Sequence, residues 1–322
     1  MRKLARPVIN AVLMVALLLL LSQCSQIRNL SKERVLKPDE AANLADAYDP
    51  WVNRKPPRRD LAKLPPDRLE ALGELSLQNR DFEASLLRFL EILKDNPGRY
   101  DLRYKVGVIF LLSGQMEAAQ KELAFVLLHR PEMLEAHEAL GLVHLQEKQY
   151  PLAIQEFQVV AHKDPKRAKA RYLLGVSLLE AGQYAQAITH LKVAADLEPS
   201  QVSPLIALGD AYLRHRDYQQ ALTCLKKGQS LAPQNQKLNY HLGMVLAALK
   251  RYPEALAAFL KAGDEAQAYN NIGVHYFMEG RYGEAARCFQ RALELRPTFY
   301  HEAKANLQRA LEKLHQVREK DG

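Results

Sequence analysis

The chain has 322 residues, of which 48% are hydrophobic and 25% charged, a composition typical of a folded globular protein rather than a disordered one. Its formal net charge is +8, but residues 66–322 hold 33 basic against 31 acidic side chains, so the excess lies in residues 1–65. A nucleic-acid-binding domain concentrates Lys and Arg on its folded surface, so this distribution argues against a nucleic-acid partner.

Residues 1–23 have the layout of a secretory signal peptide. Arg2, Lys3 and Arg6 precede an apolar run from Val8 to Leu21. This run has 14 residues, which is shorter than the roughly 20 that a membrane-spanning helix needs. The sequence therefore predicts an exported protein.

The end of this leader, Leu21-Ser22-Gln23-Cys24, resembles the lipobox of bacterial lipoproteins, although Gln23 stands where Gly, Ala or Ser is usual. In that family the cysteine becomes the lipid-modified N-terminus after cleavage. The resemblance implies a lipid anchor at Cys24, and Ser25 after it implies an outer-membrane lipoprotein that faces the periplasm. Two alternatives are an inner-membrane anchor formed by an uncleaved N-terminal helix and free secretion.

Residues 24–65 fit a lipidated N-terminus followed by a linker rich in proline and charge. Pro38 favours one short helix from about Asp39 to Tyr48. The linker also carries a basic cluster, which we interpret as a solvated face, with anionic lipid headgroups or a partner as the alternative. The cluster consists of Arg54, Lys55, Arg58, Arg59 and Lys63.

Seven glycines recur at a near-fixed step through the rest of the chain. Gly73, Gly107, Gly141, Gly175, Gly209 and Gly243 are each 34 residues apart, and Gly273 follows after 30. Prolines keep the same step at Pro97, Pro131, Pro165, Pro199 and Pro233. A period of this size is typical of a solenoid of stacked repeats.

Each period is predicted to form two amphipathic helices joined by a tight turn. In residues 168–201, Gly182 separates two runs of helical spacing. The apolar positions are Leu174, Leu178 and Leu179 in the first run and Ala187, Leu191 and Ala194 in the second. We expect the small Gly175 and Ala187 where the two helices cross closely.

This pattern resembles the tetratricopeptide repeat (TPR) family, whose 34-position frame carries Gly or Ala at position 8, an aromatic residue at 17, Ala at 20 and Pro at 32. Counting from Pro66, position 17 holds Tyr150, Tyr184, Tyr218 and Tyr252. The resemblance implies an all-α, right-handed TPR solenoid of about seven helix-turn-helix repeats over residues 66–299. Position 4, often Trp in the family, departs from the pattern at Arg103, His137 and Arg171.

The step from Gly243 to Gly273 lacks four residues and the expected proline. The helix before Gly263 should therefore end about one turn sooner. Either this shortening kinks the superhelix and opens its groove, or it is silent variation.

Residues 300–322 are predicted to form a C-terminal capping helix and tail, because the last repeat needs a cover with a polar outer face. One apolar stripe follows helical spacing through Ala303, Leu307, Leu311 and Leu314. Cys224 and Cys288 lie about two repeats apart, too far for a disulfide, so we expect two free and mostly buried thiols.

No motif in the chain indicates catalysis, so we expect neither an enzyme nor a cofactor, metal site or small-molecule substrate. His137 and His144, seven apart, are interpreted as packing residues rather than metal ligands. In TPR proteins positions 2, 5, 9, 12 and 13 of each first helix line a concave groove. Here the predicted apolar partner groove consists of Tyr104, Val108, Leu112, Leu142, Leu145, Tyr172, Val176, Leu179, Ile206, Leu213, Tyr240, Met244, Val274 and Phe277.

Residues 263–273 are similar to the last repeats of TadD-like lipoproteins, which serve tight-adherence pilus assembly. The resemblance implies a lipid-anchored adaptor that binds a protein partner and supports assembly of an envelope machine, with a pilus or secretion system first. The alternatives are an adaptor for peptidoglycan hydrolases or polysaccharide export, an accessory subunit of an envelope enzyme, and a structural spacer.

Overall fold

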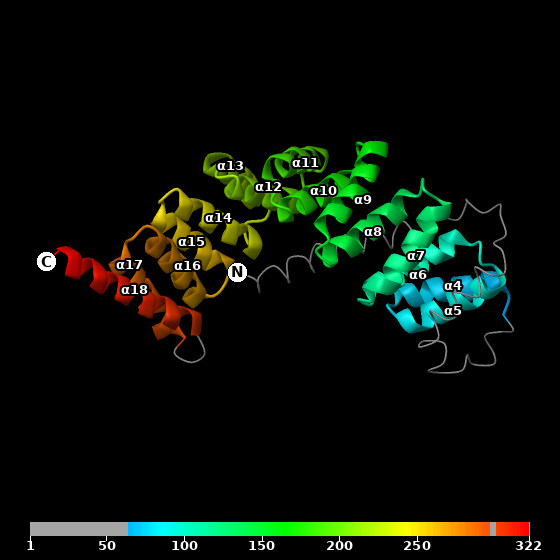
Figure 1. Ribbon diagram of the computed structural model, residues 1–322, viewed down its shortest axis with the longest axis horizontal. Helices are drawn as coiled ribbons and strands as arrows, with labels where there is room; N and C mark the ends of the chain where they lie inside the picture. Colours follow the sequence, from blue (N-terminus) through cyan, green and yellow to red (C-terminus); the bar gives the residue numbers. More distant parts are fainter. Residues whose placement is uncertain (1–63, 297–300, 322) are drawn as a thin grey trace. The chain divides into compact units, whose positions relative to one another are not determined.

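The computed structural model describes residues 64–296 and 301–321, and every regular element in these ranges is an α-helix (Figure 1). The leader, Cys24, the helix expected over residues 39–48 and nearly all of the linker lie outside the described residues. Among the residues that are described, no helix combines the length and the apolar character needed to cross a bilayer.

Fourteen of the fifteen helices in the described ranges form seven consecutive pairs, which confirms the predicted helix-turn-helix repeats. The pairs are α4 (Pro66–Gln78) with α5 (Phe82–Asp95), α6 (Tyr100–Leu112) with α7 (Met116–His129), α8 (Leu134–Gln146) with α9 (Tyr150–Lys163), α10 (Ala168–Glu180) with α11 (Tyr184–Leu197), α12 (Val202–Arg214) with α13 (Tyr218–Leu231), α14 (Gln236–Ala248) with α15 (Tyr252–Ala262), and α16 (Glu265–Met278) with α17 (Tyr282–Leu295). The last helix, α18 (His301–Asp321), stands alone.

The contacts divide the chain within the first turn of α10. The first unit runs to Ala170 and the second begins at Arg171. Each unit is therefore described by itself below.

Each of the seven periodic glycines, from Gly73 to Gly273, lies against one large side chain on the second helix of the same pair. A Cβ atom added at Gly141 would come within 2.7 Å of Phe157 in the first unit, and one at Gly243 within 2.6 Å of Phe259 in the second. Real Cβ atoms do not approach so closely, so the absence of a side chain sets how near the two helices of a pair lie. The 30-residue step preserves this contact, because Gly273 lies against Phe289 in the same way.

The turn between the two helices of each pair needs one residue in the left-handed region. Glycine takes that place at Gly182, with φ of +79°, but Lys148 and Lys250 adopt φ of +62° at the equivalent position. A side chain is strained there, by roughly 1–2 kcal/mol relative to glycine.

The polar residues at position 4 have a structural role in the repeat. Arg103 Nε donates to the carbonyl oxygen of Pro97 at 3.1 Å, and Arg103 Nη1 pairs with Glu122 of the second helix at 3.2 Å. His137 makes the equivalent contacts with the carbonyl oxygen of Pro131 and with Glu156. The position where the family often has Trp is thus occupied here by side chains that form hydrogen bonds with carbonyl oxygens just after the preceding helix.

The helix before the shortened step ends about one turn early, as predicted. α15 has 11 residues where the other second helices have 14, and it ends at Ala262. Asp264 then caps α16, because its carboxylate accepts from the backbone N–H of Gln267 at 3.0 Å.

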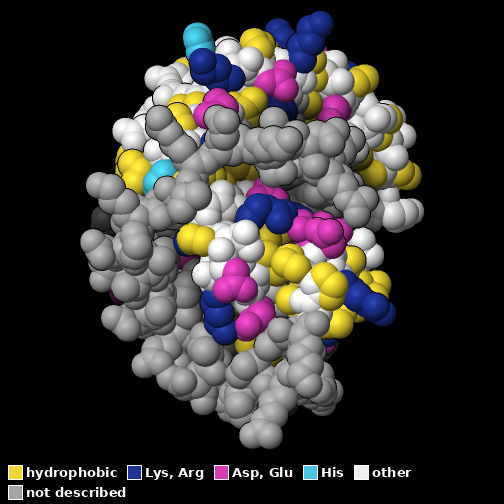
Figure 2. Space-filling model, turned by 90° about the vertical axis from the view of Figure 1, so that its right-hand side faces the viewer, with side chains coloured by type: hydrophobic (Ala, Val, Ile, Leu, Met, Phe, Trp, Pro, Cys, Tyr) yellow, Lys and Arg dark blue, Asp and Glu magenta, His cyan; other side chains and the backbone are white. Residues whose placement is uncertain are grey.

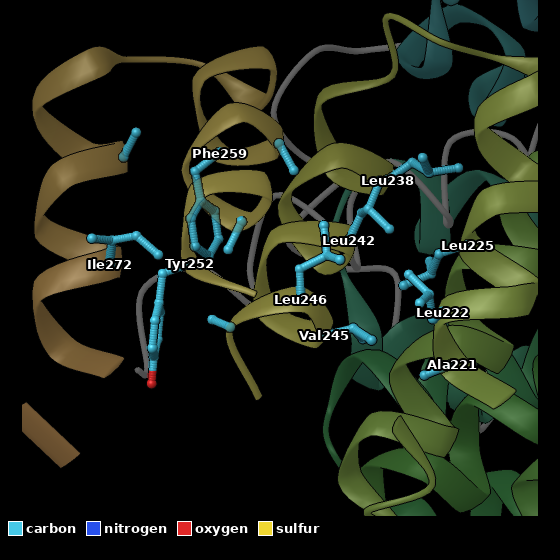
Figure 3. Close-up of a cluster of buried hydrophobic side chains, with 14 of the residues drawn as sticks. Ala221, Leu222, Leu225, Leu238, Leu242, Val245, Leu246, Tyr252, Phe259 and Ile272 are labelled. Atoms are coloured by element: carbon cyan, nitrogen blue, oxygen red, sulfur yellow. The ribbon is translucent and has the colours of Figure 1, made fainter. Parts of the chain in front are cut away.

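The core of the second unit is a run of leucine and aromatic side chains between consecutive helices. Figure 3 shows Leu222 and Leu225 of α13, Leu242 of α14 and Phe259 of α15 in one buried cluster that extends to Ile272 of α16. Cys224 and Cys288 are free and half-buried, and burial raises the pKa of each thiol. The prediction of two free thiols is confirmed.

Candidate partner-binding faces

We call the side chains at positions 2, 5, 9, 12 and 13 of the first helices the first-helix face of each unit. The structure divides the predicted groove residues on these faces into two groups. Six are buried: Tyr104, Val108, Leu142, Leu145, Leu179 and Ile206. Eight are half-buried: Leu112, Tyr172, Val176, Leu213, Tyr240, Met244, Val274 and Phe277.

Several half-buried groove residues also contribute to the core. Tyr240 and Met244 pack against the core cluster of the second unit, and Phe277 packs against a smaller cluster around Phe289. The exposed apolar area is therefore smaller than the full set of residues suggests. The partner groove stays a prediction, and its half-buried members are the ones that present surface.

The first-helix face of the first unit carries carboxylates that are held by cations of the next repeat. Glu70 and Glu74 of α4 lie 3.1 and 2.8 Å from Lys105 Nζ, and the Lys105 side chain is only 4% exposed. Burial lowers the pKa of Lys105, but hydrogen bonding to Glu74 and the charges of both carboxylates outweigh it, so this pKa lies above its ordinary value.

Glu138 of α8 is completely buried on the same face. Its two oxygens lie 2.6 Å from Arg167 Nε, directly before the next repeat, and 3.0 Å from Lys169 Nζ, in the first turn of that repeat. Burial lowers the pKa of Lys169 in spite of the Glu138 charge. A carboxylate enclosed in this way joins consecutive repeats and offers no free surface to a ligand.

The first-helix face of the second unit has charged side chains that remain accessible. Asp210 of α12 pairs with Arg214 at 3.1 Å, and its other oxygen lies 3.7 Å from His241 Nδ1 of α14, too far for a hydrogen bond. The side chains of Asp210, His241 and Arg214 are 15%, 14% and 42% exposed. His241 Nδ1 has no hydrogen-bond partner within the described ranges.

Burial lowers the pKa of two basic side chains in the second unit, His241 and Lys237. It lowers the pKa of His241, against the charge of Asp210 and with help from Lys237 and Arg214, so the imidazole is neutral at pH 7. It also lowers the pKa of Lys237, which the charges of Asp210 and Glu180 oppose. Burial, and after it the charge of Asp210, raises the pKa of Tyr240, whose ring centroid is 5.7 Å from that of His241.

The sequence prediction collected only the apolar members of the five groove positions and missed these charged ones. Glu70 and Glu138 occupy position 5 and Asp210 occupies position 9, in the frame that starts at Pro66. Reading every residue type in that frame would have found them. The first-helix faces thus mix apolar and charged side chains, and the predicted apolar groove covers only the apolar members.

Two further sequence expectations concern polar residues. His144 Nδ1 lies 2.7 Å from Gln149 Oε1, and His137 contacts Glu156, so each has a partner inside the protein. Within the described ranges no group of three or more His, Cys, Asp or Glu side chains is placed to hold a metal ion. On the face shown in Figure 2, basic and acidic side chains are interspersed rather than gathered by sign.

Comparisons with protein families give a consistent result over the described chain. Family models described as tetratricopeptide repeat match residues 70–124, 113–168, 206–264, 144–208, 178–230 and 266–299. A search of curated proteins found no match.

Solved structures with similar folds include a tetratricopeptide repeat protein from Parabacteroides merdae, with a TM-score of 0.58 and 14% identity over 76% of this chain and 98% of that one. At this identity the likeness shows the fold alone. MamA from Desulfovibrio magneticus, residues 41 to the end, has a TM-score of 0.50 and 25% identity over 52% of this chain and 94% of that one.

Proposed function

The chain belongs to the tetratricopeptide repeat family, and from this premise we propose that it is a lipid-anchored scaffold of the bacterial envelope that binds a segment of a protein partner. Repeats of this family imply a scaffold for protein–protein interaction, and no catalytic family matches the chain. The family itself implies only the scaffold; the lipid anchor, the envelope location and the machine to be assembled are our proposal.

The observation that carries the proposal is the first-helix face of the second unit. Tyr240 and Met244 offer half-buried apolar surface, and the adjacent His241 lies in the field of Asp210, Lys237 and Arg214, which carry both signs of charge. Apolar contacts contribute most of the affinity at such a surface, while half-buried charges select the partner by complementarity. We therefore infer a partner segment in which apolar side chains alternate with acidic and basic ones.

Site-specific photocrosslinking in cells tests this part of the proposal. A photoreactive residue in place of Tyr240 should capture one dominant protein, whereas the same residue in place of the exposed Gln220, on the second helix α13, should not. If both positions capture the same set of proteins, or neither captures any, the first-helix face is not the binding surface.

The anchor at Cys24 is supported by the lipobox resemblance of residues 21–24. Several acyl chains bury enough methylene groups to hold a protein durably on a membrane. Cys24→Ser should abolish incorporation of labelled fatty acid and release the protein into the soluble fraction. Membrane attachment that persists in this variant would instead favour an uncleaved N-terminal helix.

We propose a pilus or secretion system as the machine served, on the resemblance of residues 263–273 to TadD-like lipoproteins. The identity of the protein captured at Tyr240 decides this point. A secretin or pilus component supports the proposal, whereas a peptidoglycan hydrolase, a polysaccharide-export protein or an envelope enzyme supports the corresponding alternative.

A further inference from the structure

Four lysines form a row across the second helices of the second unit. Lys192 of α11 and Lys226 of α13 share position 25 of the repeat, and Lys227 of α13 and Lys261 of α15 share position 26, in the frame that starts at Pro66. Equivalent positions of stacked repeats lie side by side across the stack. All four residues are exposed. We call Lys192, Lys226, Lys227 and Lys261 the lysine row.

Two members of the lysine row act on the same side chain from neighbouring repeats. Burial raises the pKa of the Cys224 thiol on α13, and the charges of Lys227 and Lys192 oppose this shift. Charges separated by more than about 10 Å are largely screened in water. The ammonium groups of α11 and α13 therefore lie close enough to create one positive field.

The carboxylates near the lysine row leave most of its charge unpaired. Within the residues that the structure describes, none of the four ammonium groups forms an ion pair. Glu254 of α15 pairs instead with Arg251 at 2.6 Å, and this hydrogen bond lowers the pKa of Glu254 more than the charge of Lys226 does. In the described ranges Asp196, four residues after Lys192, is the one carboxylate of α11, α13 and α15 without an ion pair.

Exposed leucines stand beside the lysine row. Leu197, Leu231 and Leu260 are 38%, 45% and 41% exposed. Leu231 lies four residues after Lys227, so both are on one side of α13, and Leu260 directly precedes Lys261 on α15. Lysine together with exposed leucine is typical of helices that lie on a membrane surface.

The first unit has no such row, although it is built from the same repeat. The residues at positions 25 and 26 of its three repeats are Leu90 and Glu91, Ala124 and Phe125, and Gln158 and Val159. None of them is basic, so the repeat does not require a cation at either position. Packing of the repeats therefore does not account for the lysine row.

We propose that the lysine row binds the anionic headgroups of a phospholipid bilayer. A lysine ammonium group is a mobile point charge that suits a fluid surface of phosphate groups, and the attraction of several such groups adds. The proposal rests on the anchor proposed at Cys24, which would keep the second unit near a bilayer. Because the row lies on second helices, its binding leaves the first-helix face of the second unit open to a protein partner.

Two other occupants fit the lysine row less well. A second copy of this chain would bring two rows of like charge together, which is destabilising. Protein interfaces are depleted of lysine and enriched in arginine and aromatic residues, whereas the row consists of lysine alone. A bilayer is therefore a better occupant than an acidic protein segment.

Lysine labelling of the full-length chain in nanodiscs tests the proposal. The chain is anchored in discs of phosphatidylcholine or of phosphatidylglycerol, treated briefly with an amine-reactive ester and analysed by mass spectrometry. Each lysine of the row should react roughly fivefold more slowly in phosphatidylglycerol, and about 0.5 M salt should remove the difference. The exposed lysines of the first unit should react equally in both lipids; these are Lys94, Lys121, Lys163 and Lys166.

Paired variants separate the lysine row from the total charge. Lys226→Glu with Lys227→Glu should restore the labelling of the two remaining lysines of the row in phosphatidylglycerol to the rate in phosphatidylcholine. Lys121→Glu with Lys163→Glu changes the net charge equally and should leave the row protected. Circular dichroism of both variants should match the parent chain, because all four substituted residues are exposed.

The basic linker is a separate candidate for headgroup binding. Its five cations are removed together by Arg54→Gln, Lys55→Gln, Arg58→Gln, Arg59→Gln and Lys63→Gln. The lysine row should stay protected in this variant, and a loss of protection would assign the lipid contact to the linker instead.

Failure of the anchor and failure of the lysine row give different results. A chain that does not stay on phosphatidylcholine discs contradicts the anchor alone, and the row is then tested by the same labelling with phosphatidylglycerol vesicles added to the chain in solution.

Three outcomes overturn the proposal. Equal labelling of the row in both lipids, or equal protection of the first-unit lysines, removes the row from headgroup binding. A row that reacts freely in phosphatidylglycerol discs but is protected in intact cells has an acidic protein as its occupant. Protection in both lipids that increases with the concentration of the chain makes a second copy the occupant.

Discussion

The two units share one packing scheme but use charge on their first-helix faces differently. In the first unit Glu138 is completely buried between two cations, and Lys105 is 4% exposed between two carboxylates. In the second unit Asp210 and His241 lie 3.7 Å apart and keep 15% and 14% of their side chains exposed. Glycine contacts are equally close in both units. The first unit therefore has a fully enclosed carboxylate, Glu138, while Asp210 of the second unit is partly exposed, as are Glu70 and Glu74 of the first unit at 19% and 33%.

Removing the carboxylate of Glu138 in the first unit and of Asp210 in the second should give the largest difference in the free energy of unfolding. Glu138→Ala leaves two cations without their buried partner and should lower the free energy of unfolding by about 3–5 kcal/mol. Asp210→Ala removes a partly exposed pair and should cost less than about 1 kcal/mol. Urea denaturation followed by circular dichroism measures both. Equal losses in the two variants would contradict the comparison.

Substituting the periodic glycines should lower stability by similar amounts in the two units, because the glycine contacts are equally close in both. Gly141→Leu and Gly243→Leu would each force a side chain into the space of a phenylalanine ring and should cost about 2–3 kcal/mol. Thermal unfolding of the two variants, with Gly283→Leu of α17 as a helical position where no atom lies within 4 Å, separates overpacking from helix propensity.

These glycines also mark how far the sequence predicts the structure. The frame that starts at Pro66 gave the beginnings of α4, α6, α8, α10, α12 and α14 without error, because glycine, tyrosine and proline each meet a local geometric need. The partners of Glu138 and Lys105 lie about one repeat away along the chain, so their pairing depends on how repeats stack. Burial of Tyr104 and Val108 likewise depends on tertiary packing and could not be read from position alone. Cys24 stays a prediction because it lies outside the described residues.

Lowering the pH should change the stability of the two units in opposite directions. Burial lowers the pKa of His190, His241 and His275 in the second unit, so unfolding takes up protons there and stability falls as the pH drops below about 6.5. In the first unit burial also lowers the pKa of His137, but hydrogen bonding to Glu156 outweighs it and raises this pKa. His137 therefore contributes stability at low pH that is lost as the pH rises through its folded pKa.

Hydrogen exchange resolved by segment, at pH 7.5 and 5.5, measures this difference after correction for the intrinsic rates. Protection in α12–α16 should fall relative to protection in α8 and α9, by on the order of 1 kcal/mol. His241→Gln should reduce the loss in the second unit. A uniform change across both units would show that the buried histidines do not set the response.

The smallest effect should come from the turns that hold a side chain in the left-handed region. Lys148→Gly in the first unit and Lys250→Gly in the second should each stabilise the fold by about 0.5–1 kcal/mol, because glycine removes the strain at φ of +62°. Differential scanning calorimetry detects the rise in Tm. A fall in Tm at either site would mean that the lost backbone entropy exceeds the relieved strain.

The central claim is that the second unit presents the surface that recognises a protein partner. Isothermal titration of the full-length chain with the protein captured at Tyr240 tests it most directly. Asp210→Ala combined with Tyr240→Ala should weaken binding at least tenfold, while Glu70→Gln on the first unit should leave the affinity within twofold of the parent chain. Unchanged affinity in the double variant, with the fold intact by circular dichroism, would contradict the account.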